Sequence, residues 1–221
     1  MIRVELWGDY ACFSRPDLKT ERVSYDVMTP SAARGILDAI YWRPGVTWNI
    51  LSIKVCEPIE FMALCRYEVK SCISRLSSDV IASKELQNGN FYLSTKAERQ
   101  QRSSMILKNV RYIVDAYFTM DDECVDKDNS GKIQDIMTRR IRKGQGGKRP
   151  YFGCREFAAM FATPRTDYVC PESLRGDIDL GVMFYDFDYS DEKNIRPMFF
   201  RAVMKNGVIR VPARDSKEVL R

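Results

Sequence analysis

The first quarter of the chain shows two hydrophobic patterns in turn. Residues 2–7 alternate apolar side chains with charged or aromatic ones, which predicts a β-strand. Residues 30–43 follow Thr29, a favourable N-cap, carry apolar residues at helical spacing and stop at a Pro-Gly pair, so they predict an α-helix. Residues 46–56 alternate again and are rich in β-branched residues. This part of the chain therefore predicts a strand, a helix and a second strand.

A similar order recurs between residues 105 and 161. Residues 105–120 predict a long strand, residues 132–143 an amphipathic helix that ends at Gly144, and residues 153–161 a further strand. The whole order is strand, helix, strand, strand, helix, strand. This is the βαββαβ arrangement of ferredoxin-like folds, which RNA-recognition domains share.

Two segments lie outside this order. Residues 58–98 hold short apolar stretches and an Asn-Gly-Asn turn at 88–90, which favours a hairpin insertion. Residues 163–221 predict short strands, with a tight Asn206-Gly207 turn between the last two. We therefore expect an α+β protein. A ferredoxin-like (RRM-like) domain would span residues 1–162, with its insertion at about 58–98, and a small C-terminal antiparallel β-sheet domain would span residues 163–221.

Positive charge is concentrated in one short segment. Six of the eleven residues from Arg139 to Arg149 are Arg or Lys, and none is acidic. The chain has 35 basic and 30 acidic residues, so removing these six leaves 29 against 30. A cationic segment on a near-neutral body is expected for a protein that binds a phosphate backbone. The alternative is a helix end whose cations offset the helix dipole, but a dipole needs only one or two.

The composition excludes several classes of chemistry. The chain has no histidine, which excludes Ser-His-Asp and Cys-His hydrolases and His-dependent ribonucleases. Its seven cysteines show no C-x-x-C spacing, which argues against a zinc site and fits a reducing cytoplasm. Residues 126–131 resemble the start of a calcium loop, but Met137 stands where a bidentate glutamate is required. We expect neither a metal nor another cofactor, and no membrane association, because no run of 18 apolar residues occurs.

Several motifs, in the same order, resemble one known family. They are GDYACFSRP at 8–16, TPSAARGI at 29–36, AIYWRP at 39–44, RQQR at 99–102, and the stretch from Arg139 to Phe157. Together they are similar to a CRISPR-associated family, the fifth Cas family in its type I-C branch (subtype d, also called c). The resemblance covers nearly the whole chain and is weakest over residues 58–98 and in the tail.

The resemblance implies a precursor CRISPR RNA (pre-crRNA) endoribonuclease. Members of this branch cut CRISPR repeat RNA at the base of its hairpin without a metal. They then stay on the crRNA 5′ handle in the interference complex, beside its backbone and large subunits. The family's active site is a Tyr, a Lys and a His. Tyr41 matches the tyrosine and Lys108 the lysine, while Asn109 stands where the histidine is expected.

The predicted site combines this catalytic set with the cationic segment and other basic or aromatic residues near element ends. Glycines in the segment would let backbone N–H groups approach phosphates. The expected RNA-binding residues are Arg15, Arg43, Arg99, Arg102, Arg139, Arg140, Arg142, Lys143, Gly144, Gly146, Gly147, Lys148, Arg149, Tyr151 and Arg155. Cleavage would use the substrate's own 2′-OH and leave a 2′,3′-cyclic phosphate.

Two other functions compete with this one. The missing histidine favours a non-catalytic subunit that only holds the crRNA 5′ handle. A weaker alternative is a protein that binds duplex DNA without regard to its sequence.

Overall fold

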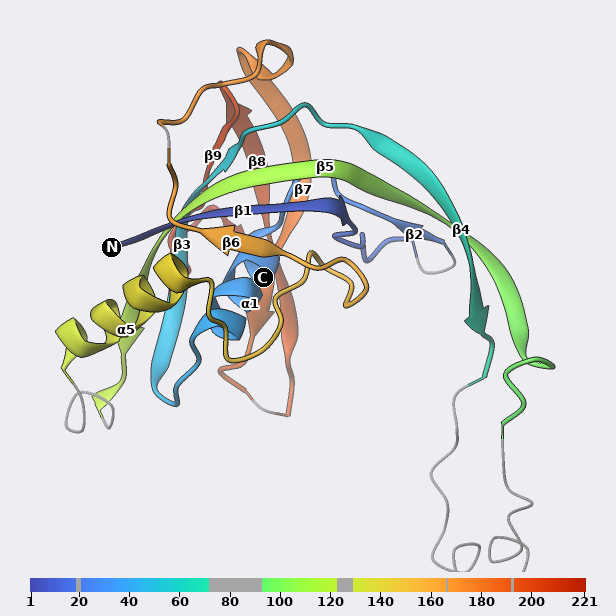
Figure 1. The fold of residues 1–221 in the computed structure, drawn as a ribbon, viewed down its shortest axis with the longest axis horizontal. Coiled ribbons are helices and arrows are strands. Elements are labelled where there is room, and N and C mark those ends of the chain that lie inside the picture. The colour runs from blue at the N-terminus through green and yellow to red at the C-terminus, as the bar shows by residue number, and fades with distance from the viewer. Residues whose placement is uncertain (19–20, 72–92, 123–128, 166, 192) are drawn as a thin grey trace, which may run out of the picture. The chain divides into compact units, whose positions relative to one another are not determined.

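The computed structural model describes residues 1–18, 21–71, 93–122, 129–165, 167–191 and 193–221. These residues form two compact units (Figure 1). The larger comprises residues 1–62 and 105–221, and the smaller comprises residues 63–104. The Asn-Gly-Asn turn expected at 88–90 lies outside the described residues.

An antiparallel sheet forms the centre of the larger unit. Four of its strands lie in the order β3 (Val46–Val55), β5 (Arg99–Met120), β1 (Ile2–Ala11) and β6 (Met160–Ala162). Each neighbouring pair among these four is antiparallel, with Val4 opposite Val114 and Ile53 also opposite Val114. A short strand, β2 (Arg22–Val23), also pairs with β5. The fold is therefore α+β with a mainly antiparallel sheet, as the sequence predicts.

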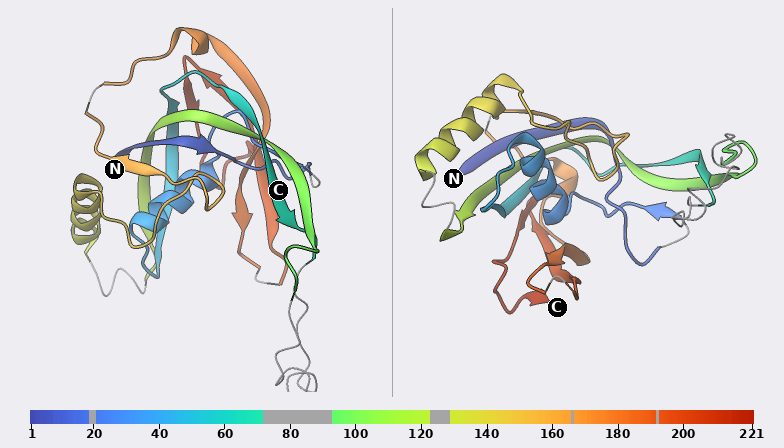
Figure 2. Two further views of the ribbon diagram at one scale, coloured as in Figure 1. Left: turned by 45° about the vertical axis from the view of Figure 1, so that its right-hand side comes forward. Right: turned by 90° about the horizontal axis from the view of Figure 1, so that it is seen from below.

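Two helices pack against this sheet and against each other (Figure 2). α1 (Pro30–Ile40) contacts β3, and α5 (Ser130–Lys143) contacts β1 and β6. The apolar positions that predict α1 are buried, and so are those that predict α5 except Ile136, which is half-exposed: Ala33, Ile36, Leu37 and Ile40 in α1, and Ile133, Met137 and Ile141 in α5. Neither described α-helix combines the length and hydropathy that crossing a bilayer requires.

The C-terminal strands extend the same sheet. β7 (Asp177–Asp188) pairs with β8 (Arg196–Lys205), which also pairs with β9 (Val208–Arg210) and β10 (Val219–Leu220). Asn206 and Gly207 have φ values of 48° and 72°, so the predicted tight turn between β8 and β9 is confirmed. β9 also pairs with β3, and the compact unit includes both regions. A domain boundary at residue 162 stays a prediction.

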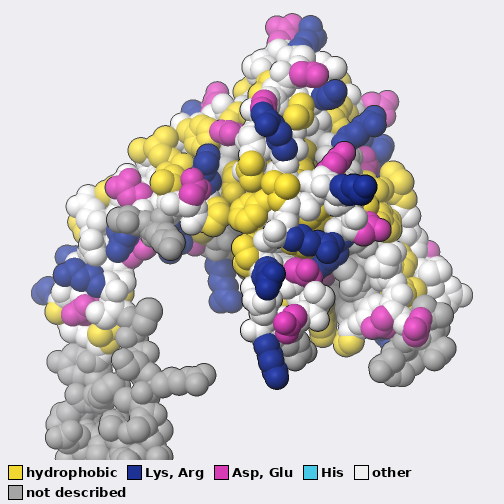
Figure 3. All heavy atoms as spheres, turned by 180° about the vertical axis from the view of Figure 1, so that it is seen from behind, with side chains coloured by type: hydrophobic (Ala, Val, Ile, Leu, Met, Phe, Trp, Pro, Cys, Tyr) yellow, Lys and Arg dark blue, Asp and Glu magenta, His cyan; other side chains and the backbone are white. Residues whose placement is uncertain are grey.

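Ion pairs connect the strands on one face of the sheet. The Asp115 side chain lies on this face, and its neighbours Val114 and Ala116 point to the opposite one. Asp115 is 5% exposed, and its carboxylate accepts hydrogen bonds from Arg3 on β1 and Ser52 on β3. It also lies 2.9 Å from the Lys54 ammonium group. The space-filling view in Figure 3 likewise shows basic and acidic side chains interspersed over one face.

The expected strand at 153–161 is wrong in its position. Only residues 160–162 form a strand, and the residues before them make turns. Gly153 has a φ of 77°, and a Cβ there would overlap the Cys12 carbonyl oxygen. Close approach to another segment, rather than strand pairing, therefore explains this glycine.

The smaller unit is a strand pair. Its parts of β4 (Phe61–Val69) and β5 pair with each other, and the Lys70 N–H donates to the Glu98 carbonyl at 3.0 Å. Residues on either side of 72–92 thus belong to one strand pair, and the hairpin insertion expected at about 58–98 stays a prediction. The long strand begins at Arg99 rather than at residue 105 because the preceding polar residues also pair with β4.

Candidate nucleic-acid interface

The cationic segment begins on the last turns of α5. The Asn129 side chain caps the start of this helix by accepting from the Gly131 N–H at 2.8 Å. Gly144 ends it in the left-handed region, with a φ of 64°. Three basic residues, Arg140, Arg142 and Lys143, occupy the last turn. Both helix ends therefore follow from local capping chemistry.

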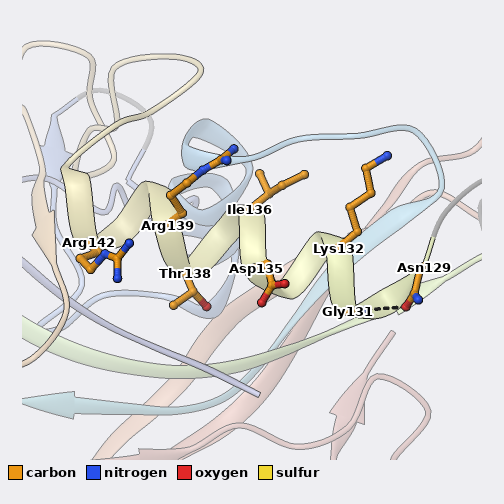
Figure 4. Close-up of a pocket in the computed structure, with 8 residues that line it drawn as sticks. All are labelled: Asn129, Gly131, Lys132, Asp135, Ile136, Thr138, Arg139 and Arg142. Carbon is orange, nitrogen blue, oxygen red and sulfur yellow. Dashed lines mark hydrogen bonds between the residues drawn. The ribbon is translucent and has the colours of Figure 1, made fainter.

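The exposed side of α5 borders an open hollow and carries further polar groups. Lys132 and Arg139 point to one side of the helix, and Asp135 and Arg142 point to the other (Figure 4). Lys132 is absent from the expected RNA-binding set. Helical spacing is the sequence signal that points to Lys132, because it precedes Arg139 by seven residues and residues seven apart lie on the same face of a helix.

The loop after α5 is bound to the end of α1. The N–H groups of Gly147 and Lys148 donate to the carbonyls of Ile40 and Ala39 at 3.2 and 2.9 Å. A Cβ at Gly146 would lie 2.7 Å from the Lys148 carbonyl oxygen. Gly147 therefore caps the end of α1, and Gly146 lies where a Cβ would be too close to the Lys148 carbonyl. The N–H groups of Gly147 and Lys148 are already bonded, whereas the exposed cationic side chains are available to phosphates.

Tyr41 and Arg140 meet where the two helices join. The Arg140 guanidinium lies 5.0 Å from the centre of the Tyr41 ring and donates to the Ile40 carbonyl at 2.5 Å. Tyr41 is 7% exposed, and its own carbonyl accepts from the Trp48 indole N–H at 3.0 Å. The structure thus brings together two of the predicted residues, one catalytic and one RNA-binding.

The described part of the protein does not neutralise the cations of the segment. Among the described residues, no carboxylate forms an ion pair with any of the six, which are Arg139, Arg140, Arg142, Lys143, Lys148 and Arg149. All except Arg140 are exposed. Their positive field is therefore directed to solvent or to a ligand.

Exposed aromatic rings flank this segment. Trp42 follows Tyr41 at the end of α1 and is 65% exposed, and Tyr151 follows the loop and is 40% exposed. Arg43 is half-buried and Arg155 is exposed. Aromatic rings beside exposed cations suit a nucleic acid strand, whose bases stack on rings while its phosphates bind cations.

Lys108 and Asn109 lie apart from Tyr41. Lys108 is opposite Tyr10 in the pairing of β1 with β5, and its ammonium group lies 3.0 Å from the Glu60 carboxylate. Trp48, which contacts Tyr41, is opposite Phe118, roughly 33 Å from Lys108 along the strand. Within the described residues no contact joins Tyr41 to Lys108, so the predicted catalytic set is not assembled as one site in this structure.

The remaining predicted residues lie elsewhere. Arg15 forms an exposed ion pair with Asp17 at 3.2 Å, and its guanidinium lies 5.5 Å from the centre of the Tyr25 ring. Arg99 and Arg102 belong to the smaller unit, where the Arg99 guanidinium lies 4.6 Å from the centre of the Tyr67 ring. Their role in RNA binding stays a prediction.

One thiol near the loop has an altered acidity. The Cys154 sulfur lies 3.7 Å from the Arg22 guanidinium. A side-chain hydrogen bond from Cys12 and, to a lesser extent, the nearby Arg22 lower the pKa of Cys154 to about 6. The five described cysteines all carry free thiols.

Comparisons with known proteins cover the whole chain. Residues 1–212 match the Cas5d family, described as CRISPR-associated protein (Cas_Cas5). A "CRISPR pre-crRNA endoribonuclease Cas5d" of Mannheimia succiniciproducens is 43% identical over all of this chain and 98% of that relative. Another, from Thermus thermophilus, is 34% identical over all of this chain and 95% of the relative.

A solved structure has the same fold. A crystal structure of a CRISPR-associated protein is 25% identical and superposes with a TM-score of 0.68, covering 99% of this chain and 95% of its own. The family match and the full-length relatives agree with the resemblance found in the sequence. The chain belongs to the Cas5d family of CRISPR-associated proteins.

Proposed function

We propose that this protein is an endoribonuclease that cuts precursor CRISPR repeat RNA at the base of its hairpin, without a metal. It then stays on the crRNA 5′ handle beside other subunits of a type I-C interference complex. Two relatives named pre-crRNA endoribonucleases, similar over their full length, support the activity. The observation that carries the proposal is the cluster of six cations, without ion pairs to any described carboxylate, near Tyr41 and Trp42.

The fold offers a platform for an RNA strand. We infer that β1, α1, β3, β5, α5 and β6 form a ferredoxin-like core, because the strand order β3-β5-β1-β6 is that of the βαββαβ arrangement. α1 contacts β3, α5 contacts β1 and β6, and the two helices contact each other. This packing places the end of α1 and the end of α5 side by side, where the cationic segment is anchored.

The reaction requires no group beyond the RNA, side chains and water. The substrate 2′-hydroxyl loses its proton to water as its oxygen attacks the adjacent phosphorus. The bond to the leaving 5′-oxygen breaks and this oxygen takes up a proton from water, so a 2′,3′-cyclic phosphate and a 5′-hydroxyl end result. Tyr41 would orient the 2′-hydroxyl, and Arg140 with the loop cations would stabilise charge on the phosphorane. Alignment alone can contribute about 7–11 kcal/mol in ideal intramolecular cases, so a slow enzyme can work without histidine.

Cleavage of the cognate repeat RNA in EDTA tests this proposal. Tyr41→Phe removes the hydroxyl but keeps the ring on which Arg140 lies, so we expect cleavage to slow roughly 100-fold with little change in RNA affinity. Tyr189→Phe is the matched control, since Tyr189 is 52% exposed and distant in sequence from the cationic segment. Cleavage at the parental rate by Tyr41→Phe would contradict the assignment of Tyr41. Products that lack a cyclic phosphate would contradict the mechanism.

A non-catalytic handle-binding subunit is the second candidate. Two observations favour it: the chain has no histidine, and Lys108 is paired with Glu60 rather than placed beside Tyr41. The same assay separates the candidates, because a binding subunit retains repeat RNA and leaves it uncut with or without a divalent metal.

A further inference from the structure

A separate cavity opens beside α1. It has a volume of about 350 Å³, at the lower end of the range for small-ligand pockets. Aromatic side chains form much of its wall, and small residues of α1 form its floor. The residues that line it include Phe13, Tyr25, Tyr151, Phe184, Gly35 and Ala39. This is the size and lining expected for a flat, partly apolar group.

Hydrogen bonds hold the aromatic wall in place. The Tyr25 N–H donates to the Phe13 carbonyl at 2.8 Å, and the Tyr25 hydroxyl accepts from the Phe184 N–H at 3.3 Å. Phe13 and Tyr25 are 3% and 5% exposed. The cavity is therefore formed before any ligand arrives, so binding would lose little side-chain entropy.

An ion pair fixes the floor against the wall. Arg34 on α1 donates to both oxygens of Asp186 on β7, at 2.7 and 3.0 Å, and Asp186 is almost fully buried. Arg34 precedes Gly35, and Asp186 lies two residues after Phe184. A Cβ built at Gly35 meets no atom within 4 Å, so the space above this glycine is open.

The charges around the cavity indicate the class of ligand. Lys148 is anchored at one end, because its N–H donates to the carbonyl of Ala39, a floor residue. Arg15 lies over the Tyr25 ring at another part of the wall. Its ion pair with Asp17 is exposed and contributes little to stability, so Arg15 can exchange Asp17 for a phosphate. The lining residues, all of them described, include hydroxyls of serine, threonine and tyrosine but no carboxylate.

We propose that this cavity binds a single unpaired nucleobase of the repeat RNA, with the flanking phosphates on Lys148, Arg149 and Arg15. The inference rests on the proposed function and specifies how part of the RNA is held. An unpaired base presents a π-face to the rings and polar edges to the hydroxyls, and it is always flanked by phosphates. A paired base cannot enter, so the cavity selects an unpaired segment.

Substitution of Gly35 tests the cavity directly. Gly35→Leu fills the open space and also raises helix propensity, so the variant should keep its melting temperature. We expect its affinity for the cognate repeat RNA, measured by fluorescence anisotropy at fixed salt, to fall roughly tenfold. Tyr151→Ala removes an exposed ring of the wall and should weaken binding in the same direction. Ala213→Leu introduces the same side chain at an exposed site outside the lining and serves as the control.

A scan with abasic RNA distinguishes the base from the backbone. Single abasic substitutions in the unpaired parts of the repeat should reveal one position that weakens binding to the parental protein and has no further effect on Gly35→Leu. If Gly35→Leu folds and binds every RNA as the parental protein does, the cavity proposal is wrong while RNA binding stands. If the parental protein does not bind repeat RNA, the proposed function fails, and this inference fails with it.

Discussion

At the scale of single residues, backbone conformation explains a position that the resemblance places in the active site. Asn109 has a φ of 51° within β5, and asparagine tolerates this left-handed conformation better than other residues with a Cβ. Its neighbours Lys108 and Val110 pair with Tyr10 and Gly8 on β1. A local bend in a paired strand therefore accounts for the asparagine.

Substitutions at Asn109 should affect stability through the backbone. We expect Asn109→Val to lower the free energy of unfolding by about 1–2 kcal/mol, because a β-branched residue is disfavoured at positive φ. Asn109→Gly should change it little, since glycine adopts this conformation readily. Urea unfolding measures both variants. An equal loss of unfolding free energy in Asn109→Val and Asn109→Gly would show that the asparagine amide group, and not the backbone conformation, stabilises the protein at this position.

At the scale of elements, the loop after α5 has two roles: its backbone contacts α1, and its side chains carry positive charge. Its glycines bring the backbone against the end of α1, and its cations remain directed outward. A role for the Gly147 N–H group in phosphate binding would require its hydrogen bond to the Ile40 carbonyl to break. RNA affinity should therefore depend on the side chains of this loop, and hence on salt.

Neutralising the loop should reduce the salt dependence of RNA binding. Each lost phosphate contact lowers the log–log salt slope by about 0.7 for a single strand, so four lost contacts lower it by roughly 3. The test variant replaces four cations by alanine: Arg142, Lys143, Lys148 and Arg149. The control removes the same charge from exposed positions near the C-terminus: Arg175, Lys193, Lys205 and Lys217. Equal slopes for these two variants would show that only net charge matters.

At the scale of the whole molecule, a buried carboxylate joins three strands. Burial by itself would raise the pKa of Asp115, but hydrogen bonds from Arg3, Lys54 and Ser52 outweigh it, and the pKa is held below its usual value. The ionised form is thus favoured in the folded state. Its contribution to stability is fully present above about pH 4 and is lost as the pH falls through the folded pKa.

Asp115→Asn should therefore destabilise the protein in a pH-dependent way. We expect a loss of about 1–3 kcal/mol at pH 7, because the partners of Asp115 lose a charged acceptor. The difference from the parental protein should shrink at pH 3, as measured by urea unfolding at both values. Asp179→Asn, which breaks the exposed pair with Arg201, is the control and should have a smaller effect. A difference that does not depend on pH would contradict this account.

Local chemistry makes much of this protein predictable from its sequence. Thr29 and Pro30 define the start of α1, Gly144 the end of α5, and Asn206 with Gly207 a turn, because caps and turns depend on a few adjacent residues. The concentration of cations is likewise a property of the chain itself. The family also follows from sequence, since its motifs are short and ordered.

Only the tertiary structure decided which distant segments meet. It joined β9 to β3, bound the loop to the end of α1, left Tyr41 beside Arg140 and apart from Lys108, and opened a cavity above Gly35. The misplaced strand at 153–161 has the same cause, because contact with Cys12 outweighed local pattern there. Hydrophobic periodicity specifies which face of an element is buried, but not which remote segment covers it.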